Sequence, residues 1–281
     1  MDISGRVPGY ILQVGAKNGS PDSPFVYVYH VKIMHHHQVC ESCEICVYPL
    51  PSLAVPSLLR ETVAVVIDVL RATSVFTYAT HSGIRKVIPV MDVDTAFQLK
   101  KHYPPEDILL GGERGCLPIE GFDLGNSPQH YTPERVAGKT LILTTTNGTV
   151  AMQAARSART IYIASFLNAA AVVECLQNEN KIAIICAGTN GSETEEDLLL
   201  AGCLTDRLKK HRQYRLDATA ERTAGLWMES MNATQLEKSL RESKGGKSLV
   251  RLGLDADIQV SAQLDTIGVV PQLLPHQSSH R

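Results

Sequence analysis

The stretch AVVIDVLRATSV, residues 64–75, joins an apolar run to a polar turn and then to a second apolar pattern. Its first four residues are apolar without interruption, which is typical of a strand buried on both faces of a sheet. Asp68, Arg71, Thr73 and Ser74 then follow within seven positions. A carboxylate, a guanidinium and two hydroxyls at a strand end indicate either a turn that binds metal or anions, or a capped helix start with a structural ion pair.

The same plan repeats along the chain. Uninterrupted apolar runs of strand length are TVAVVID (62–68), RKVIPV (85–90), DILLG (107–111), KTLILTTT (139–146), RTIYIAS (159–165) and KIAIICAG (181–188). Helices are expected at 74–82, 93–102, 148–157, 168–178, 194–210 and, amphipathic and longer, at 216–242. This alternation predicts an α/β protein, a three-layer α/β/α fold with a mostly parallel sheet and an active site at the C-terminal edge of its strands.

Composition divides the chain into three parts. Residues 1–44 form an N-terminal extension rich in Gly, Ser, Pro and His, which we expect to be poorly ordered, and Met34 is a candidate start. Residues 45–275 carry the α/β pattern, and 276–281 are a short tail. Within and beside the extension, Cys40, Cys43, Cys46 and His35–His37 are a candidate zinc cluster, although a second clean ligand pair is missing.

Charge and cysteine content exclude several classes of protein. The 281 residues carry a net charge of -2, with 44% hydrophobic and 20% charged residues, which is typical of a globular protein. There is no basic stripe for nucleic acid and no apolar run long enough to cross a membrane. Seven cysteines and no signal peptide predict a reducing, cytoplasmic location. The sequence leaves open whether the protein is a homo-oligomer.

Three strand-to-helix turns are expected to meet, because the C-terminal ends of parallel strands lie on one sheet edge. They are Asp68–Ser74, Thr144–Thr149 and Gly188–Asp197. The last is acidic, and its carboxylates either favour the helix dipole or, opposite Asp68, hold Mg²⁺. The middle turn is neutral and rich in donors, so it is either a phosphate cradle or a simple turn with Gly for backbone freedom.

Two further loops are candidates. GGERGCLPIEGFDLGNSP (111–128) is a long polar loop with five glycines, which is either functional or poorly ordered. SKGGKSLVRLG (243–253) places Lys244, Lys247 and Arg251 around a Gly pair, as a basic capping loop or a solvated helix start. It is no phosphate-binding P-loop, because Arg241 stands where Gly is needed.

Seven segments together resemble the 2-phosphosulfolactate phosphatase (ComB) family over about residues 46–272. They are VVIDVLRATS, GGERG, GFDLGNSP, TTTNGT, SFLNAAAVV, EEDLLLAG and KSLVRLGLDADIQVSAQLD. The resemblance implies an α/β/α fold and Mg²⁺-dependent hydrolysis of 2-phospho-3-sulfolactate to 3-sulfolactate and phosphate. Two alternatives stay open: a phosphatase for another small phosphorylated hydroxy acid, and a non-catalytic anion-binding module on the same fold.

The turns, the loops and the resemblance together give single residues candidate roles. The catalytic set is Asp68, Arg71, Glu113 and Asn147, and the metal set is Asp68, Glu196 and Asp197 with Mg²⁺. The set that contacts a small substrate bearing phosphate, sulfonate and carboxylate is Thr73, Arg114, Asn126, Ser127, Thr145, Thr146, Gly148, Thr149, Asn168 and Lys247, and Asp123 belongs to the same motifs. Whether Asp68 attacks phosphorus or binds the metal is left open.

Overall fold

The computed structural model describes residues 43–230 and 233–273. The N-terminal extension, apart from Cys43 and Glu44, lies outside the described residues, and so does the tail at 276–281. The candidate zinc cluster, apart from Cys43 and Cys46, therefore also lies outside them. In the described part, no helix is long and apolar enough to cross a membrane.

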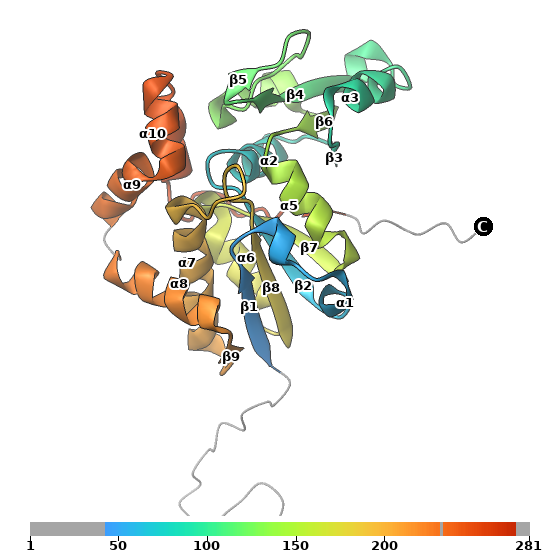
Figure 1. The fold of residues 1–281 in the computed structure, drawn as a ribbon. Helices are drawn as coiled ribbons and strands as arrows, with labels where there is room; N and C mark the ends of the chain where they lie inside the picture. The colour runs from blue at the N-terminus through green and yellow to red at the C-terminus, as the bar shows by residue number, and fades with distance from the viewer. Residues whose placement is uncertain (1–42, 231–232, 274–281) are drawn as a thin grey trace, which may run out of the picture. The chain divides into compact units, whose positions relative to one another are not determined.

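The larger sheet has six strands in the order β10-β7-β2-β8-β1-β9 (Figure 1). Their bounds are β1 Glu44–Tyr48, β2 Val63–Ile67, β7 Thr160–Ala164, β8 Lys181–Cys186, β9 Arg215–Leu216 and β10 Gln272–Leu273. All are parallel except β10. All five residues of β2 are buried, as the uninterrupted apolar run predicts. Each fully buried Val or Ile there stabilises the fold by roughly 1.5–3 kcal/mol.

A second, smaller sheet has the order β3-β6-β4-β5. It contains β3 Lys86–Pro89, β4 Ile108–Arg114, β5 Leu117–Pro118 and β6 Thr140–Thr144, and only β5 is antiparallel. Gly112, with φ of 141°, lets β4 approach β6 closely, since an added Cβ would lie 1.9 Å from the Thr144 carbonyl oxygen. The six predicted strands are confirmed, and they are divided between two mostly parallel sheets.

The helices alternate with the strands as the sequence predicts. Their bounds are α1 Pro56–Leu59, α2 Ala72–His81, α3 Val93–Lys100, α4 Pro133–Val136, α5 Gly148–Ala154, α6 Ala169–Leu176, α7 Glu195–His211, α8 Ala218–Glu229, α9 Ala233–Glu242, α10 Lys244–Arg251 and α11 Asp255–Ser261, with short 3-10 turns at Pro51–Leu53, Pro105–Asp107, Pro128–His130, Ala155–Ser157 and Phe166–Asn168. The expected helix at 216–242 is two helices, α8 and α9. Ala220, Ala224 and Trp227 of α8 are buried, as their helical spacing predicts.

Helices cover both faces of the larger sheet, which confirms the three-layer α/β/α class. On one face Ala64 and Val66 of β2 lie in a core with Val75 of α2 and Ala151 of α5. Leu141 and Leu143 of β6 join the same core, so the smaller sheet packs beyond these two helices. On the other face, α7 contacts β2 and β8, and α8 contacts β1.

The three predicted turns do meet, but they follow strands of two different sheets and do not lie along the edge of a single sheet. β2 and β8 end side by side, because Ile67 pairs with Cys186. The turn Thr144–Thr149 follows β6 of the smaller sheet. Helix α5, which begins in this turn, brings it next to the turn after β2. A Cβ added at Gly148 would lie 2.4 Å from the Ala72 Cβ. The starts of α2 and α5 therefore touch, and this contact needs Gly at position 148.

Candidate active site

Asp197 ties together the ends of the two central strands of the larger sheet. One carboxylate oxygen accepts the Val69 N–H at 2.9 Å and the other accepts the Gly188 N–H at 3.0 Å. Val69 follows β2 and Gly188 follows β8, so one buried side chain fixes both turns. Asp197 thus has a structural function at the strand ends, and its role as a metal ligand stays a prediction.

Asp68 directly follows the last residue of β2. Its Oδ1 accepts the Ala72 N–H at 3.3 Å, at the start of α2. Its Oδ2 faces the start of α5, where a Cβ added at Gly148 would lie 2.7 Å from it. The side chain is 8% exposed and lines a pocket, so it is accessible to a small ligand.

Three carboxyls near the strand ends have pKa values raised to about 7: Asp68, Glu196 and Asp197. Burial is the main cause in each case, since a charged form is disfavoured away from water. Their mutual charges raise the pKa values further: Glu196 acts on Asp68, Asp197 on Glu196, and Asp68 on Asp197. A bound cation would relieve this repulsion.

Two of these carboxylates have oxygens suited to a metal ion. Glu196 Oε2 is buried and has no hydrogen-bond partner among the described residues. Asp68 lines the pocket, and its Oδ2 lies beside Gly148. Within residues 43–230 and 233–273, no group of three or more His, Cys, Asp or Glu side chains is arranged to hold a metal. Mg²⁺ commonly takes one or two carboxylates and completes its shell with water and substrate phosphate, so few protein ligands suffice; Asp68 lines the pocket, whereas Glu196 does not.

Arg71 is held rigidly by a buried network. Its Nη1 donates to Asp257 Oδ2 at 2.5 Å and to Ser127 Oγ at 3.4 Å, and its Nη2 donates to the Cys116 carbonyl at 2.9 Å. Ser127 Oγ also donates to the same Asp257 oxygen, at 2.9 Å. Arg71 is 3% exposed and Asp257 is 1% exposed. A guanidinium fixed on three sides can present its remaining N–H groups to an anion without losing side-chain entropy on binding.

Glu113 joins two loops from the smaller sheet. Oε2 accepts the Cys116 N–H and Oε1 accepts the Thr146 N–H, both at 2.7 Å. The first bond holds the turn between β4 and β5, and the second holds the turn between β6 and α5. Glu113 thus fixes the two loops that face Asp68, and it lines the same pocket.

The neutral turn after β6 is ordered by its own side chains. Thr145 Oγ1 accepts the Thr149 N–H at 3.1 Å, and Thr149 Oγ1 donates to the Thr145 carbonyl at 2.7 Å. Asn147 Oδ1 accepts the Asn190 N–H at 3.3 Å from the loop after β8. Thr146 Oγ1 is buried without a hydrogen-bond partner in the described part of the chain. Thr146 and Asn147 are the residues of this turn that line the pocket.

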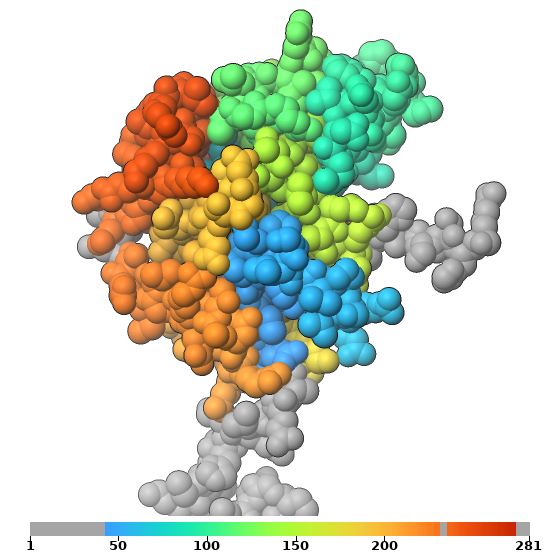
Figure 2. Space-filling view, in the orientation of Figure 1, coloured from blue at the N-terminus to red at the C-terminus, as the bar shows by residue number. Residues whose placement is uncertain are grey.

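These loops and helix α10 enclose a pocket of about 440 Å³. Its lining residues are Asp68, Leu70, Arg71, Glu113, Gly115, Cys116, Asn126, Thr146, Asn147, Thr189, Asn190, Gly245, Ser248, Arg251 and Leu252. They come from the ends of β2, β4, β6 and β8, from the loop after β5, and from α10 and the residue that follows it. Figure 2 shows the surface of these parts, α10 in red-orange, the loop after β8 in gold and β4–β5 in green, meeting on one face.

The structure brings all four residues of the predicted catalytic set to this pocket. Of the predicted substrate contacts, Asn126 and Thr146 line it as well. The Asn126 Oδ1 atom is buried and has no hydrogen-bond partner in the described residues, so it is available to a ligand. Ser127 does not line the pocket, but its hydroxyl hydrogen-bonds both Arg71 and Asp257.

Other predicted residues have structural partners instead. Thr73 Oγ1 bonds the Asp68 backbone and Ser74 Oγ donates to the Val69 carbonyl, so the predicted side-chain cap of α2 is wrong. Asn168 is fully buried and donates to the Ile163 and Val269 carbonyls.

Further predicted residues lie outside the pocket lining: Arg114, Asp123, Lys247, Thr145, Gly148, Thr149, Glu196 and Asp197. Arg114 donates to the Thr144 hydroxyl and to the Glu113 carbonyl. Asp123 accepts the Leu110 N–H and pairs with Lys100. Lys247 is exposed. Their contact with a substrate or a metal ion stays a prediction.

Sequence reasoning missed the roles of the residues that α10, α11 and the loop after β8 contribute. Asp257 is not singled out by the sequence; Thr189 and Asn190 belong to the predicted turn Gly188–Asp197, and Gly245, Ser248, Arg251 and Leu252 to the predicted basic loop, without a role of their own. The segment KSLVRLGLDADIQ did carry the signal, since it contains Arg251 and Asp257. What the segment could not tell was that α10 and α11 fold back over the turn at Arg71.

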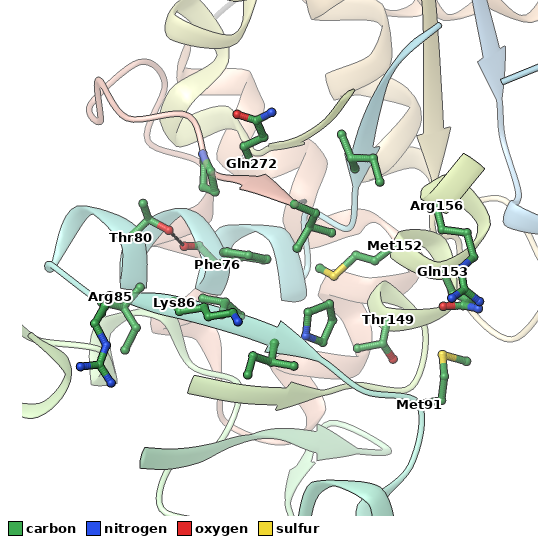
Figure 3. A pocket seen from close by; sticks show the side chains of 17 residues that line it. Phe76, Thr80, Arg85, Lys86, Met91, Thr149, Met152, Gln153, Arg156 and Gln272 are labelled. Atoms are coloured by element: carbon green, nitrogen blue, oxygen red, sulfur yellow. Dashed lines mark hydrogen bonds between the residues drawn. The ribbon is translucent and has the colours of Figure 1, made fainter. Parts of the chain in front are cut away.

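A larger groove of about 860 Å³ lies elsewhere in the described chain. Figure 3 shows Phe76 and Met152 near its middle, with Arg85 and Arg156 toward opposite ends. Its lining shares no residue with the pocket at Asp68 and contains no acidic side chain. It therefore lacks the carboxylates that metal binding or acid–base chemistry would need.

Comparison with known proteins gives one consistent result. A model of the 2-phosphosulpholactate phosphatase family matches residues 49–275, which include every residue that lines the pocket. A "Probable 2-phosphosulfolactate phosphatase" of Thermotoga maritima is 43% identical over 211 residues, covering 75% of this chain and 88% of the relative. Proteins of that name from Caldanaerobacter subterraneus subsp. tengcongensis and Clostridium acetobutylicum are 39% identical over 216 residues and 40% identical over 218. These alignments cover 76% of this chain each, and 89% and 90% of the relatives.

Proposed function

The chain belongs to the 2-phosphosulpholactate phosphatase family, and from that premise we propose that it hydrolyses 2-phospho-3-sulfolactate to 3-sulfolactate and phosphate in the pocket at Asp68. Family membership makes the protein a phosphoric monoester hydrolase. The observation that carries the proposal is the meeting of Asp68, Arg71, Glu113 and Asn147 in one pocket.

The chemistry of the pocket suits a phosphate ester. Arg71 offers a fixed positive charge, and Thr146 and Asn147 offer neutral polar groups beside it. Phosphoryl transfer needs mainly positioning and stabilisation of charge on the phosphate oxygens, which a preorganised guanidinium supplies. Asp257 and Ser127 keep that guanidinium in place, so it does not reorganise during the reaction.

We propose Mg²⁺ as the cofactor, held by Asp68 and Glu196. When bound, Mg²⁺ would neutralise charge on the phosphate oxygens. The support from the chain is the raised pKa of both carboxyls and the unpartnered Glu196 Oε2. Gly245 belongs to the same arrangement, because a Cβ there would lie 2.1 Å from Glu196 Oε1. Asp197 would support the site from behind by fixing the turns at Val69 and Gly188.

Asp68 has two candidate roles, and they predict different intermediates. As a nucleophile it would form an aspartyl phosphate, and as a metal ligand it would not. Rapid acid quench of the enzyme with ³²P-labelled substrate distinguishes them. Label that stays on Asp68 supports nucleophilic attack, and turnover that depends on Mg²⁺ without any labelled enzyme excludes it.

The function itself is tested by measuring phosphate release from 2-phospho-3-sulfolactate, with Mg²⁺ and with a chelator. The expected result is release that requires the metal. A panel with 2-phospholactate and phosphoglycerate tests the alternative that another phosphorylated hydroxy acid is the substrate. A higher kcat/KM on either of those esters would replace the proposed substrate. No release from any of them would favour a binding module. The cytoplasmic location stays a prediction.

A further inference from the structure

We propose that Arg251 of α10 binds the sulfonate group of the substrate and thereby selects sulfonated over plain phosphorylated acids. The inference rests on the proposed function and adds a specificity-determining residue to it. It also replaces Lys247, the residue that the sequence indicated in this helix, by its neighbour one helical turn further on. Both side chains are exposed, but Arg251 lines the pocket and Lys247 does not.

Arg251 has a defined orientation at the pocket wall. Its Nε donates to the Lys247 carbonyl and its Nη2 donates to Ser248 Oγ, both at 3.2 Å. Ser248 lines the pocket too, so these bonds orient the exposed guanidinium along the pocket wall. Leu252, the next residue, adds an apolar contact for the substrate's methylene group.

The charges of the lining leave Arg251 uncommitted. The charged residues that line the pocket are Asp68, Glu113, Arg71 and Arg251. Arg71 is paired with Asp257 at 2.5 Å, whereas Arg251 forms no salt bridge with any carboxylate of the described residues. A substrate with phosphate, carboxylate and sulfonate brings three anionic groups into this space. Arg251 is thus the lining cation that has no carboxylate partner among the described residues and can attract an anionic group of the substrate.

The sulfonate is the group best matched to it. Carboxylate and phosphate oxygens are good ligands for a hard cation, and in the proposed site they lie toward Asp68 and Glu196. A sulfonate spreads one charge over three oxygens and is a weak metal ligand, so it is better bound by hydrogen-bond donors. The forked, weakly hydrated guanidinium of Arg251 supplies two or more such donors to a tetrahedral oxyanion.

Two substrates isolate the sulfonate. 2-Phospholactate keeps the phosphate and the carboxylate of 2-phospho-3-sulfolactate and has a methyl group where the latter has the sulfonated methylene. For Arg251→Met we expect kcat/KM on 2-phospho-3-sulfolactate to fall roughly 10- to 100-fold, and that on 2-phospholactate to change less than about twofold. Arg251→Lys should recover part of the loss, because it keeps the charge but not the fork.

Two variants serve as comparisons. Lys238→Met removes one exposed positive charge from α9 outside the pocket lining, so it controls for the loss of a charge that does not line the pocket. Lys247→Met tests the competing residue on the same helix. Thermal unfolding of all variants checks the fold, and inhibition by the product 3-sulfolactate gives a binding readout without chemistry. Its inhibition constant should rise only in the Arg251 variants.

The possible outcomes distinguish a failure of the Arg251 inference from a failure of the proposed function. If the wild type is active and Arg251→Met lowers kcat/KM on both substrates equally, Arg251 contacts the carboxylate or the phosphate, and the inference is overturned. Loss in Lys247→Met but not in Arg251→Met would overturn it as well. A wild type that is active on 2-phospholactate and inactive on 2-phospho-3-sulfolactate would instead refute the proposed substrate. The predicted result is a loss of discrimination confined to Arg251.

Discussion

The groove at Phe76 is larger than the pocket at Asp68, but the pocket carries more of the side chains that can do chemistry. The groove has about 860 Å³ and is lined mainly by apolar side chains with the cations Arg85, Lys86 and Arg156, while the pocket has about 440 Å³ and gathers carboxylates, a buried guanidinium and amides. Volume alone would favour the groove as the ligand site. The smaller pocket is lined by the unpartnered buried atoms Asn126 Oδ1 and Thr146 Oγ1 and by Asp68, whose carboxyl pKa is raised to about 7. Perturbed ionisable groups are the better guide to reactivity here.

The two cavities are built from the same helices. α2 begins next to Arg71 at the pocket and reaches the groove at Phe76, and α5 begins at Gly148 and reaches the groove at Met152. The polar turn at the start of each helix therefore serves the pocket, and the apolar body packs in the core behind it. Variants along one helix can thus test the two regions separately.

The largest effect is expected for Asp68→Asn. Removing the carboxylate should lower kcat by on the order of 10³-fold or more, whether Asp68 binds the metal or attacks phosphorus. The unfolding temperature should stay the same or rise, because Asn removes a buried charge that Glu113 and Glu196 repel. Phosphate release and thermal unfolding check both parts. An Asn variant with wild-type activity would move the chemistry away from this pocket.

Asp257→Asn should have the next largest effect. It leaves the buried charge of Arg71 without its carboxylate partner, so we expect the unfolding free energy to fall by roughly 2–5 kcal/mol and kcat/KM to fall about 10- to 100-fold. Chemical denaturation and steady-state kinetics measure these changes.

Asp255→Asn is the matched control on the same helix. Asp255 pairs with Arg241 at the surface, and its loss should cost less than about 1 kcal/mol. Equal effects of the two variants would show that Arg71 needs no partner.

The metal-free protein should lose stability as pH rises. Carboxyls with folded pKa values near 7, against about 4 in an unfolded chain, bind protons more tightly when folded. Their stabilising contribution is therefore full below about pH 4 and is lost as pH rises to about 7. Mg²⁺ should reduce this loss.

Thermal unfolding of wild type and Asp68→Asn, across this pH range and with or without Mg²⁺, isolates the effect from other titrating groups. The pH dependence without metal should be shallower in the variant. A wild-type curve identical to that of Asp68→Asn, with and without Mg²⁺, would refute the cluster's role.

The smallest effect is expected at the groove. Arg156→Gln changes an exposed cation of the groove and should alter the unfolding free energy by less than about 0.5 kcal/mol and kcat/KM by less than about twofold. The same kinetic assay measures it. A loss comparable to that of Asp257→Asn would mean that the groove takes part in turnover.

Much of the fold was predictable because buried parallel strands have an unmistakable apolar pattern. The runs at 62–68 and 181–188 became β2 and β8, side by side and in register. The run at 139–146 looked equivalent, yet β6 belongs to the smaller sheet. Which strands pair depends on contacts between residues far apart in the sequence, and a burial pattern does not contain this information. The sequence therefore predicts a single sheet where the structure has two.

The site was predictable where a residue sits directly at a strand end. Asp68 and Asn147 follow strands, and the turns that carry them meet as expected. Asp257 and Arg251 lie on helices far along the chain, and only folding brings them to Arg71 and the pocket. The Thr73 hydroxyl illustrates the other limit, because its residue type fits a cap while its side chain bonds the Asp68 backbone.

A crystal structure with Mg²⁺ and 3-sulfolactate tests the central claim most directly. The account predicts the ion between Asp68 and Glu196, and the product in the pocket with its sulfonate on Arg251. Product bound in the groove beside Phe76 and Met152, with the pocket at Asp68 empty of both ion and product, would contradict it.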